Sequence, residues 1–173
     1  GSLPHIFKSA LVFGAALLAG QSVLWAQVDG ITVTPTPSAA GATASYQIGF
    51  NAHGGIPVGL ATIKIIFPAG FSFSSPAVTA SSGFGTASFN VTTDSLTLLI
   101  AFVSGSSVTS GAAVSFTVNG IVNPTTAGNY TVNITDVQTA DLNFQYSNPA
   151  DSPAFAITAP TITSISPTAA AVG

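Results

Sequence analysis

Side chains able to carry out catalysis are few in this chain of 173 residues. It has two His, no Cys, no Arg and no Glu, and its acidic side chains are five Asp. A Ser, His and Asp triad would have to use His53, because His5 lies in an N-terminal segment of different character. No G-x-S-x-G turn is present, and His53 precedes Gly54 and Gly55 in a predicted loop. We therefore interpret His53 as a turn residue.

The carboxylates do not predict hydrolysis either. Glycoside hydrolysis needs two carboxyl groups held at a fixed separation across a sugar. Here the Asp residues fall in predicted turns or at predicted strand ends, where Asp caps backbone amides. The absence of Cys excludes thiol catalysis, disulfides, iron–sulfur ligation and cysteine zinc sites. The sequence predicts a chain that is not an enzyme.

Calcium is the one metal that the sequence suggests. It binds carboxylates, amide carbonyls and backbone oxygens of loops. Asn133, Asp136, Asp141 and Asn143 would converge if residues 137–140 formed the turn of a hairpin. Asp136 and Asp141 are thus the candidate calcium ligands, with turn capping as the alternative. No other cofactor is expected.

Three N-x-[ST] tripeptides could accept glycans in a host that glycosylates secreted Asn. They begin at Asn90, Asn129 and Asn133. A chain this rich in Thr produces such matches by chance as well, so both interpretations stay open.

Charge excludes whole classes of partner. Only 4% of the residues are charged and the formal net charge is -3. Two Lys and no Arg cannot neutralise a phosphate backbone, so nucleic acid is not a partner. The 47% hydrophobic content is opposite to the composition of disordered chains, which predicts a folded domain.

Residues 1–26 have the layout of a secretory signal peptide: one charge at Lys8, an apolar stretch over 10–19 and a more polar exit. The expected cleavage lies between Ala26 and Gln27. A membrane-spanning helix needs about 20 apolar residues, and this stretch ends after about ten at Gly20. The alternative is a retained hydrophobic helix that anchors the protein or helps it polymerise, the only contact with a membrane that we expect.

Beyond residue 30 the chain alternates apolar and polar residues with the period of a strand. Turn formers such as Gly54–Gly55 and Asn123–Pro124 separate these stretches. Residues 100–103, apolar on both faces, predict a central strand. The three tyrosines are in phase with apolar neighbours and are predicted to lie in the core. The alternating sets are Ala44, Tyr46, Ile48, Phe50; Ile63, Ile65, Phe67; Leu96, Leu98, Ile100, Phe102; Val114, Phe116, Val118; Tyr130, Val132, Ile134; and Leu142, Phe144, Tyr146.

These stretches predict an all-β fold over residues 27–158. We expect an antiparallel Ig-like Greek-key β-sandwich of eight or nine strands, preceded by the N-terminal hydrophobic leader helix. A barrel is the alternative, because closure leaves no mark in the sequence.

Two sequence motifs carry a resemblance to a known module. One is Phe-Pro-x-Gly-Phe at residues 67–71, and the other is G-I-x-N-P-x-x-A-G-x-Y-x-V at residues 120–132. Together they resemble an Ig-like sandwich module of bacterial and archaeal cell-surface, adhesin-like proteins. We expect Asn123–Pro124 to end one strand, and Tyr130 to begin the next strand facing the core.

The tail, residues 159–173, resembles the opening strand of an IPT/TIG domain, another Ig-like module. It is too short for a complete module, so it is interpreted as a linker or as the start of a truncated domain. Both resemblances imply a modular, exported surface protein.

Three functions remain open at this point. The first is a non-enzymatic secreted or cell-surface module with a structural or adhesive role in a longer modular protein. The second is a self-assembling extracellular filament or surface-layer subunit that associates through its sheet edges. The third is a carbohydrate-binding or cohesin-like binding module. The expected partners are accordingly a protein or glycan surface, or further copies of the chain.

The first prediction concerns export. Protein that the native host has exported should begin at Gln27, because the signal peptide is removed during export. N-terminal sequencing and intact mass measure this directly. A chain that begins upstream of Ala26 would instead support the retained helix.

Overall fold

The structure is a computed structural model that describes residues 28–52, 55–138, 145–146 and 150–161. Every regular element in these ranges is a β-strand, and all the strand pairings are antiparallel. The all-β prediction is confirmed. Within the described residues no helix has the length and apolar content needed to cross a membrane. The leader at residues 1–26 lies outside them.

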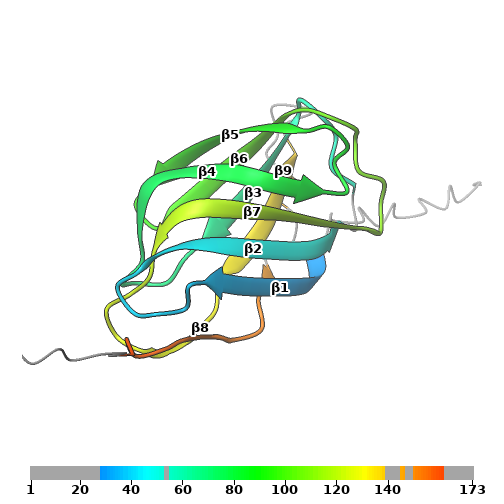
Figure 1. Cartoon of the computed structure of the whole chain (residues 1–173). Coiled ribbons are helices and arrows are strands. Elements are labelled where there is room, and N and C mark those ends of the chain that lie inside the picture. Colours follow the sequence, from blue (N-terminus) through cyan, green and yellow to red (C-terminus); the bar gives the residue numbers. More distant parts are fainter. Residues whose placement is uncertain (1–27, 53–54, 139–144, 147–149, 162–173) are drawn as a thin grey trace, which may run out of the picture.

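Two sheets make up the body of the fold (Figure 1). The first has the order β1-β2-β7-β4, and the second has the order β10-β9-β3-β6-β5, with β11 also paired to β9. A separate pair, β12 with β8, lies at one end. The strands are β1 (Val28–Thr36), β2 (Thr43–Ala52), β3 (Ala61–Ile66), β4 (Ser72–Ser82), β5 (Ser88–Asp94), β6 (Thr97–Ser104), β7 (Ala112–Val122), β8 (Gly128–Tyr130), β9 (Asn133–Gln138), β10 (Gln145–Tyr146), β11 (Ala150–Asp151) and β12 (Phe155–Ile157).

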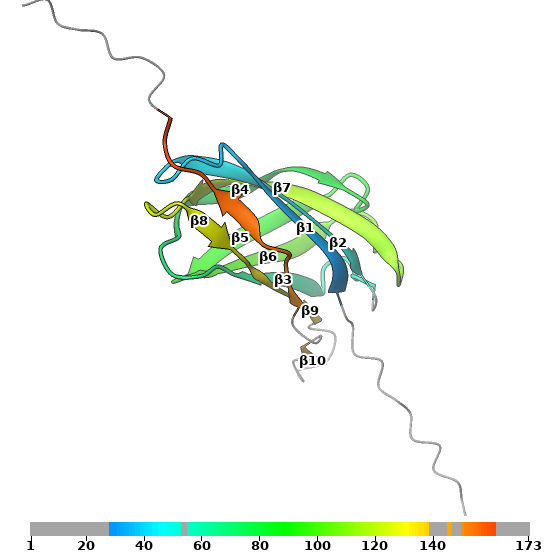
Figure 2. The same ribbon diagram turned by 90° about the horizontal axis from the view of Figure 1, so that it is seen from below.

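The two sheets face each other across one apolar core, a β-sandwich-like arrangement (Figure 2). Alternation decides which side chains enter it: in β2, Tyr46, Ile48 and Phe50 are buried, and in β3, Ile63 and Ile65 are buried. β6, interpreted from sequence as a central strand, lies between β3 and β5. The strand period read from the sequence therefore identifies the inner faces correctly.

Two features of the strands differ from the expectation. The sequence does not predict β4 and β5, because each has only two large apolar side chains that pack on the core: Phe73 and Val78 in β4, and Phe89 and Val91 in β5. The single strand expected over residues 130–134 is divided into β8 and β9. The division has a topological cause: residues 128–130 pair with β12, and residues 133–138 pair with β3 in the second sheet.

Asn123, from the second motif, is a buried polar junction. It follows the last residue of β7 and is 1% exposed. Its Oδ1 accepts a hydrogen bond from the Tyr46 hydroxyl, while its Nδ2 donates to the carbonyls of Pro37 (3.1 Å) and Ala39 (2.8 Å). Its backbone N–H donates to the carbonyl of Ala42 at 2.9 Å. One side chain thus joins the ends of β1, β2 and β7, which are far apart in sequence.

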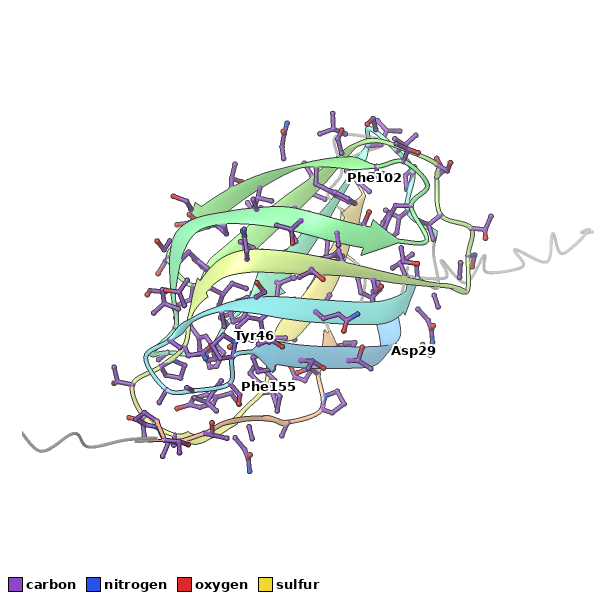
Figure 3. The ribbon with its side chains drawn as sticks, in the orientation of Figure 1. Asp29, Tyr46, Phe102 and Phe155 are labelled. Atoms are coloured by element: carbon purple, nitrogen blue, oxygen red, sulfur yellow. The ribbon has the colours of Figure 1, made fainter. Side chains whose placement is uncertain are left out.

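The two motifs meet in an aromatic cluster beside this junction. Tyr46 packs edge-on against Phe67 and Phe155, each at a ring-centroid distance of 5.8 Å, and Phe71 packs against Tyr130 at 5.3 Å. Figure 3 shows Tyr46 and Phe155 together at one end of the sandwich, with Phe102 in the opposite part. Tyr46 is in the core, as predicted, and Tyr130 is only partly buried and packs against the core. The Tyr146 side chain lies outside the described residues.

The second prediction tests the junction. Replacing Asn123 with Ala leaves the Tyr46 hydroxyl and two backbone carbonyls without their hydrogen-bond partner. This loss should lower the free energy of unfolding by about 3 kcal/mol. Urea denaturation followed by intrinsic fluorescence or circular dichroism gives this value. Asn90→Ala, at an exposed position, serves as the control and should change it by less than about 0.5 kcal/mol. Equal losses in both variants would contradict the role given to Asn123.

The third prediction concerns alkaline pH. Burial raises the pKa of the Tyr46 hydroxyl far above its ordinary value near 10. The unfolded chain therefore releases this proton at a lower pH than the folded chain, so stability is complete below pH ~10 and falls as the pH rises further. Tyr46→Phe should have a lower free energy of unfolding than the original chain at pH 7. Between pH 9 and pH 11, however, its free energy of unfolding should fall by less than that of the original chain. An identical pH slope in both proteins would exclude Tyr46 as the cause.

Candidate functional site

The candidate calcium ligands fall at the margin of the described structure. Asp136 lies in β9 with its backbone opposite Ile63, and its side chain is outside the described part, as are Asp141 and Asn143. Asn133 has another partner, because its Nδ2 donates to Asp151 Oδ1 at 2.8 Å. No group of three or more His, Asp, Glu or Cys side chains that could hold a metal occurs among the described residues.

The other sequence-predicted positions are dispersed over the fold. His53 lies outside the described residues. Of the three possible glycan acceptors, Asn90 in β5 and Asn129 in β8 are exposed, while the third tripeptide is half-buried at Asn133 and ends at Thr135, which is 5% exposed. The structure therefore leaves the first two accessible and brings none of these residues together.

Exposed large apolar side chains of the described residues occur on or beside β3 and β6 of the second sheet. We call this region the contact face, defined by Leu60, Ile66, Leu99 and Val103. Leu60 and Val103 are each 46% exposed, and Ile66 is 38% exposed. Val103 lies two residues beyond the paired Ala101 on β6, so alternation places it on the same outer side as Leu99, and Leu60 lies in the turn directly before β3. Clusters of exposed apolar side chains commonly mark interaction sites.

Lys64 lies in the middle of the contact face. Its Cα partners are Leu99 on β6 and Thr135 on β9, and its side chain is half-buried. Lys64 is the only Lys or Arg after residue 26. A Lys stem packs along apolar neighbours while the ammonium stays in water. The contact face thus combines aliphatic area with one positive charge.

A second feature is the path of the chain through the sandwich. Asp29, near the start of β1, lies at one end, and the segment after Phe155 leaves at the other end (Figure 3). Near that exit the last segment runs parallel to the end of the first, with a bridge between Ala39 and Thr158. Two backbone hydrogen bonds, Ala40 N–H to Thr158 O and Thr158 N–H to Ser38 O, are each 2.8 Å long. We call this pairing the terminal clamp.

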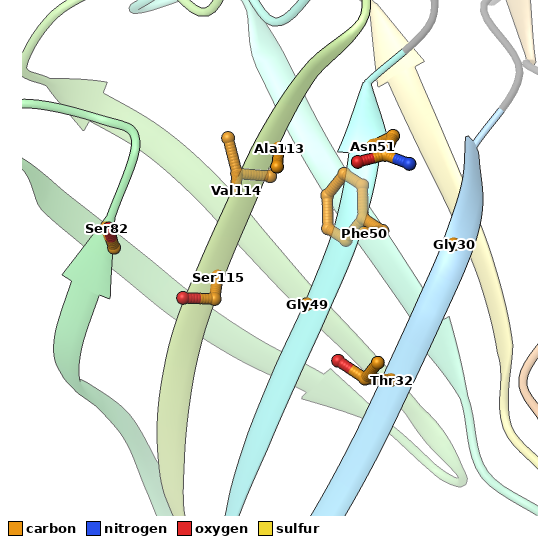
Figure 4. A pocket seen from close by; sticks show the side chains of 9 residues that line it. All are labelled: Gly30, Thr32, Gly49, Phe50, Asn51, Ser82, Ala113, Val114 and Ser115. Atoms are coloured by element: carbon orange, nitrogen blue, oxygen red, sulfur yellow. The ribbon is translucent and has the colours of Figure 1, made fainter.

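Hollows also open on the surface of the described residues. A polar depression of about 290 Å³ crosses β1, β2 and β7 on the outer face of the first sheet, lined by hydroxyls such as Thr32 and Ser115 and by the Asn51 amide (Figure 4). Asn51 Nδ2 donates to Asp29 Oδ1 at 2.9 Å. Phe50 lines the floor but is buried, so its ring offers no face for stacking on a sugar. A groove of about 450 Å³ separates β4 from the start of β5.

Comparison with known proteins adds no assignment. A scan against protein-family models finds none that matches this chain. A search of curated proteins also finds no match. The function proposed below therefore depends on the chain's own residues.

Sequence reasoning missed both the contact face and the terminal clamp. A signal for the first was present, because β6 is apolar at consecutive positions from Leu98 to Val103. This pattern indicates a central strand that is paired with a strand on each side. It does not predict whether the residues on the outer face of the sheet are exposed. The clamp has no local signal at all, since its two segments are more than a hundred residues apart.

The fourth prediction concerns the contact face. The double variant Leu60→Ser, Val103→Ser should keep the free energy of unfolding within about 1 kcal/mol of the original, because both side chains are largely exposed. It should elute earlier from a hydrophobic-interaction column, since it presents less apolar surface. Thr62→Ser, on the same face, is the control and should elute nearly unchanged. Unaltered retention of the double variant would show that the contact face does not determine binding of the protein to the hydrophobic column.

Proposed function

We propose that this chain is a non-enzymatic, exported structural or adhesive module of a longer modular protein. It serves as a stiff spacer that resists pulling between its ends and presents a contact face to a protein partner. The single observation that carries the proposal is the terminal clamp, considered together with the path of the chain from one end of the sandwich to the other.

The direction of load explains why this arrangement suits a spacer. A force applied through the two ends would pull β1 backwards along its own axis and the last segment forwards along its axis (Figure 2). The two segments are parallel, so the hydrogen bonds at Ser38, Ala40 and Thr158 would be sheared together and would not open one after another. Asn123 supports the same place, because it holds the carbonyls of Pro37 and Ala39.

The chemistry of the surface suits an adhesive role. Recognition that depends on charge needs charged side chains, and only Lys64 and five Asp follow residue 26. Apolar area and hydroxyls are what the described surface offers instead. A partner for the contact face would therefore present aliphatic side chains, together with one carboxylate for Lys64.

The finer fold assignment supports the same proposal. If β1, β2, β7 and β4 are taken as strands A, B, E and D, and β3, β9 and β10 as C, F and G, the two sheets have the Ig-like order, with the β5–β6 hairpin inserted between D and E. The Tyr130 hydroxyl donates to the Thr126 carbonyl at 2.8 Å, just before β9, in the manner of a tyrosine corner. We propose Ig-like connectivity on these grounds.

The fifth prediction tests the clamp by single-molecule pulling on the full chain. Thr158→Pro removes one of the two clamp donors, and the loss of one hydrogen bond should raise the unfolding rate under load by about threefold to tenfold. Ala159→Pro, one residue beyond the clamp, is the matched control and should unfold at the original force.

Two results would overturn the proposal. One is an equal unfolding force for the original chain and Thr158→Pro, which would mean that the clamp bears no load. The other is a hydrolytic or transferase activity in the purified chain that a point substitution abolishes.

A further inference from the structure

The four outer edges of the two sheets are protected to very different degrees. An edge strand presents unpaired N–H and C=O groups, which form a template for another strand. Proteins guard such edges with Pro, bulges, short strands or charges. The edges here are β1 and β4 in the first sheet, and β5 and the short strands beside β9 in the second.

Three of these edges are guarded. β4 contains Pro76, which has no N–H, next to Ser75 at a φ of 50°, and its register with β7 shifts twice. β1 contains Pro35 and has a register shift between Asp29 and Thr32, and the terminal clamp follows just beyond its last residue, Thr36. The edge beside β9 is occupied by β10 and β11, which have two residues each.

β5 is the exception. Its one register shift lies at its start, between Ser88 and Phe89, and from Phe89 to Asp94 it pairs with β6 without interruption. It contains neither Pro nor Lys, and its one charge, Asp94, lies at its last residue. Among the strands that the structure describes, β6 is its only ladder neighbour, and it forms the upper rim of the ribbon in Figure 1. From Ser88 to Thr92 its side chains alternate: Phe89 and Val91 pack on the core, whereas Asn90 and Thr92 are exposed.

We infer that the β5 edge binds the β5 edge of a second copy of this chain, antiparallel and centred on Thr92. In this register Thr92 faces Thr92 of the second copy, and Asp94 faces Asn90. Thr–Thr pairs and carboxylate–amide pairs are favourable across strands. The Asp94 carboxylates of the two copies then lie about 13 Å apart along the paired strands, so these like charges are not placed opposite each other.

The two-fold symmetry of this pairing has a structural consequence. The same edge is used by both copies, so the contact closes on itself and yields a dimer, not a filament. It joins the two second sheets into one continuous sheet and brings the two contact faces side by side. The inference goes beyond the proposed function, because a spacer under load needs no second copy.

Sedimentation velocity of the full chain over a range of concentrations tests the pairing. The original chain should form dimers as the concentration rises, whereas Thr92→Lys should sediment as a monomer because it places two ammonium groups opposite each other. Thr79→Lys, an equal substitution on the guarded β4 edge, should dimerise like the original. An equimolar mixture of Thr92→Lys and Thr92→Glu should recover dimers, since Lys then faces Glu. This recovery also shows that the variants fold.

Several results would overturn the inference. They are a chain that stays monomeric up to about 1 mM, assemblies larger than dimers, an unchanged dimer fraction in Thr92→Lys, equal dissociation in Thr79→Lys, and a charge-swapped mixture that stays monomeric. None of them affects the pulling experiment on the terminal clamp, so this inference and the proposed function fail separately.

Discussion

The fold depends on satisfying a few polar groups buried at one end of an apolar core. An amide or hydroxyl buried without a partner costs up to a few kcal/mol. The Asn123 side chain avoids this cost, because it forms hydrogen bonds with the Tyr46 hydroxyl and with two backbone carbonyls at once. These groups come from the β1–β2 connection, from β2 and from the residue after β7. Their hydrogen bonds can therefore form only when these three segments are in place.

The same junction connects stability to the proposed mechanical role. Asn123 binds the carbonyls of Pro37 and Ala39, which flank Ser38, and the Ser38 carbonyl accepts the Thr158 N–H of the clamp. The segment that would bear the load is therefore held from both sides, by the core through Asn123 and by the last segment through the clamp. Weakening either contact should release the other more easily.

A nearly uncharged chain must also solve problems that other proteins solve with charge. Ser, Thr and Asn at the exposed strand positions keep the outer surfaces hydrated, and backbone irregularities protect the edges. β4 shows this most clearly, where Pro76 and the positive φ of Ser75 interrupt the ladder. Gly120 of β7, at a φ of 73°, faces this irregularity, and a side chain there would meet the carbonyl of Ser74. Its lack of a side chain therefore allows the close approach of β4.

The sequence by itself determined the inner faces of β2, β3, β6 and β7, because alternation of apolar and polar residues reflects burial on one side of a strand. It also determined that Asn123–Pro124 ends a strand, since Pro constrains its own backbone and that of its neighbour. Tertiary structure alone decided the rest. β4 and β5 became strands through pairing with β7 and β6, the chain divided at residues 131–132 because its partners change there, and the clamp unites segments that no local pattern relates. The contact face was likewise undecided in the sequence, since the same apolar strand is buried or exposed according to what covers it.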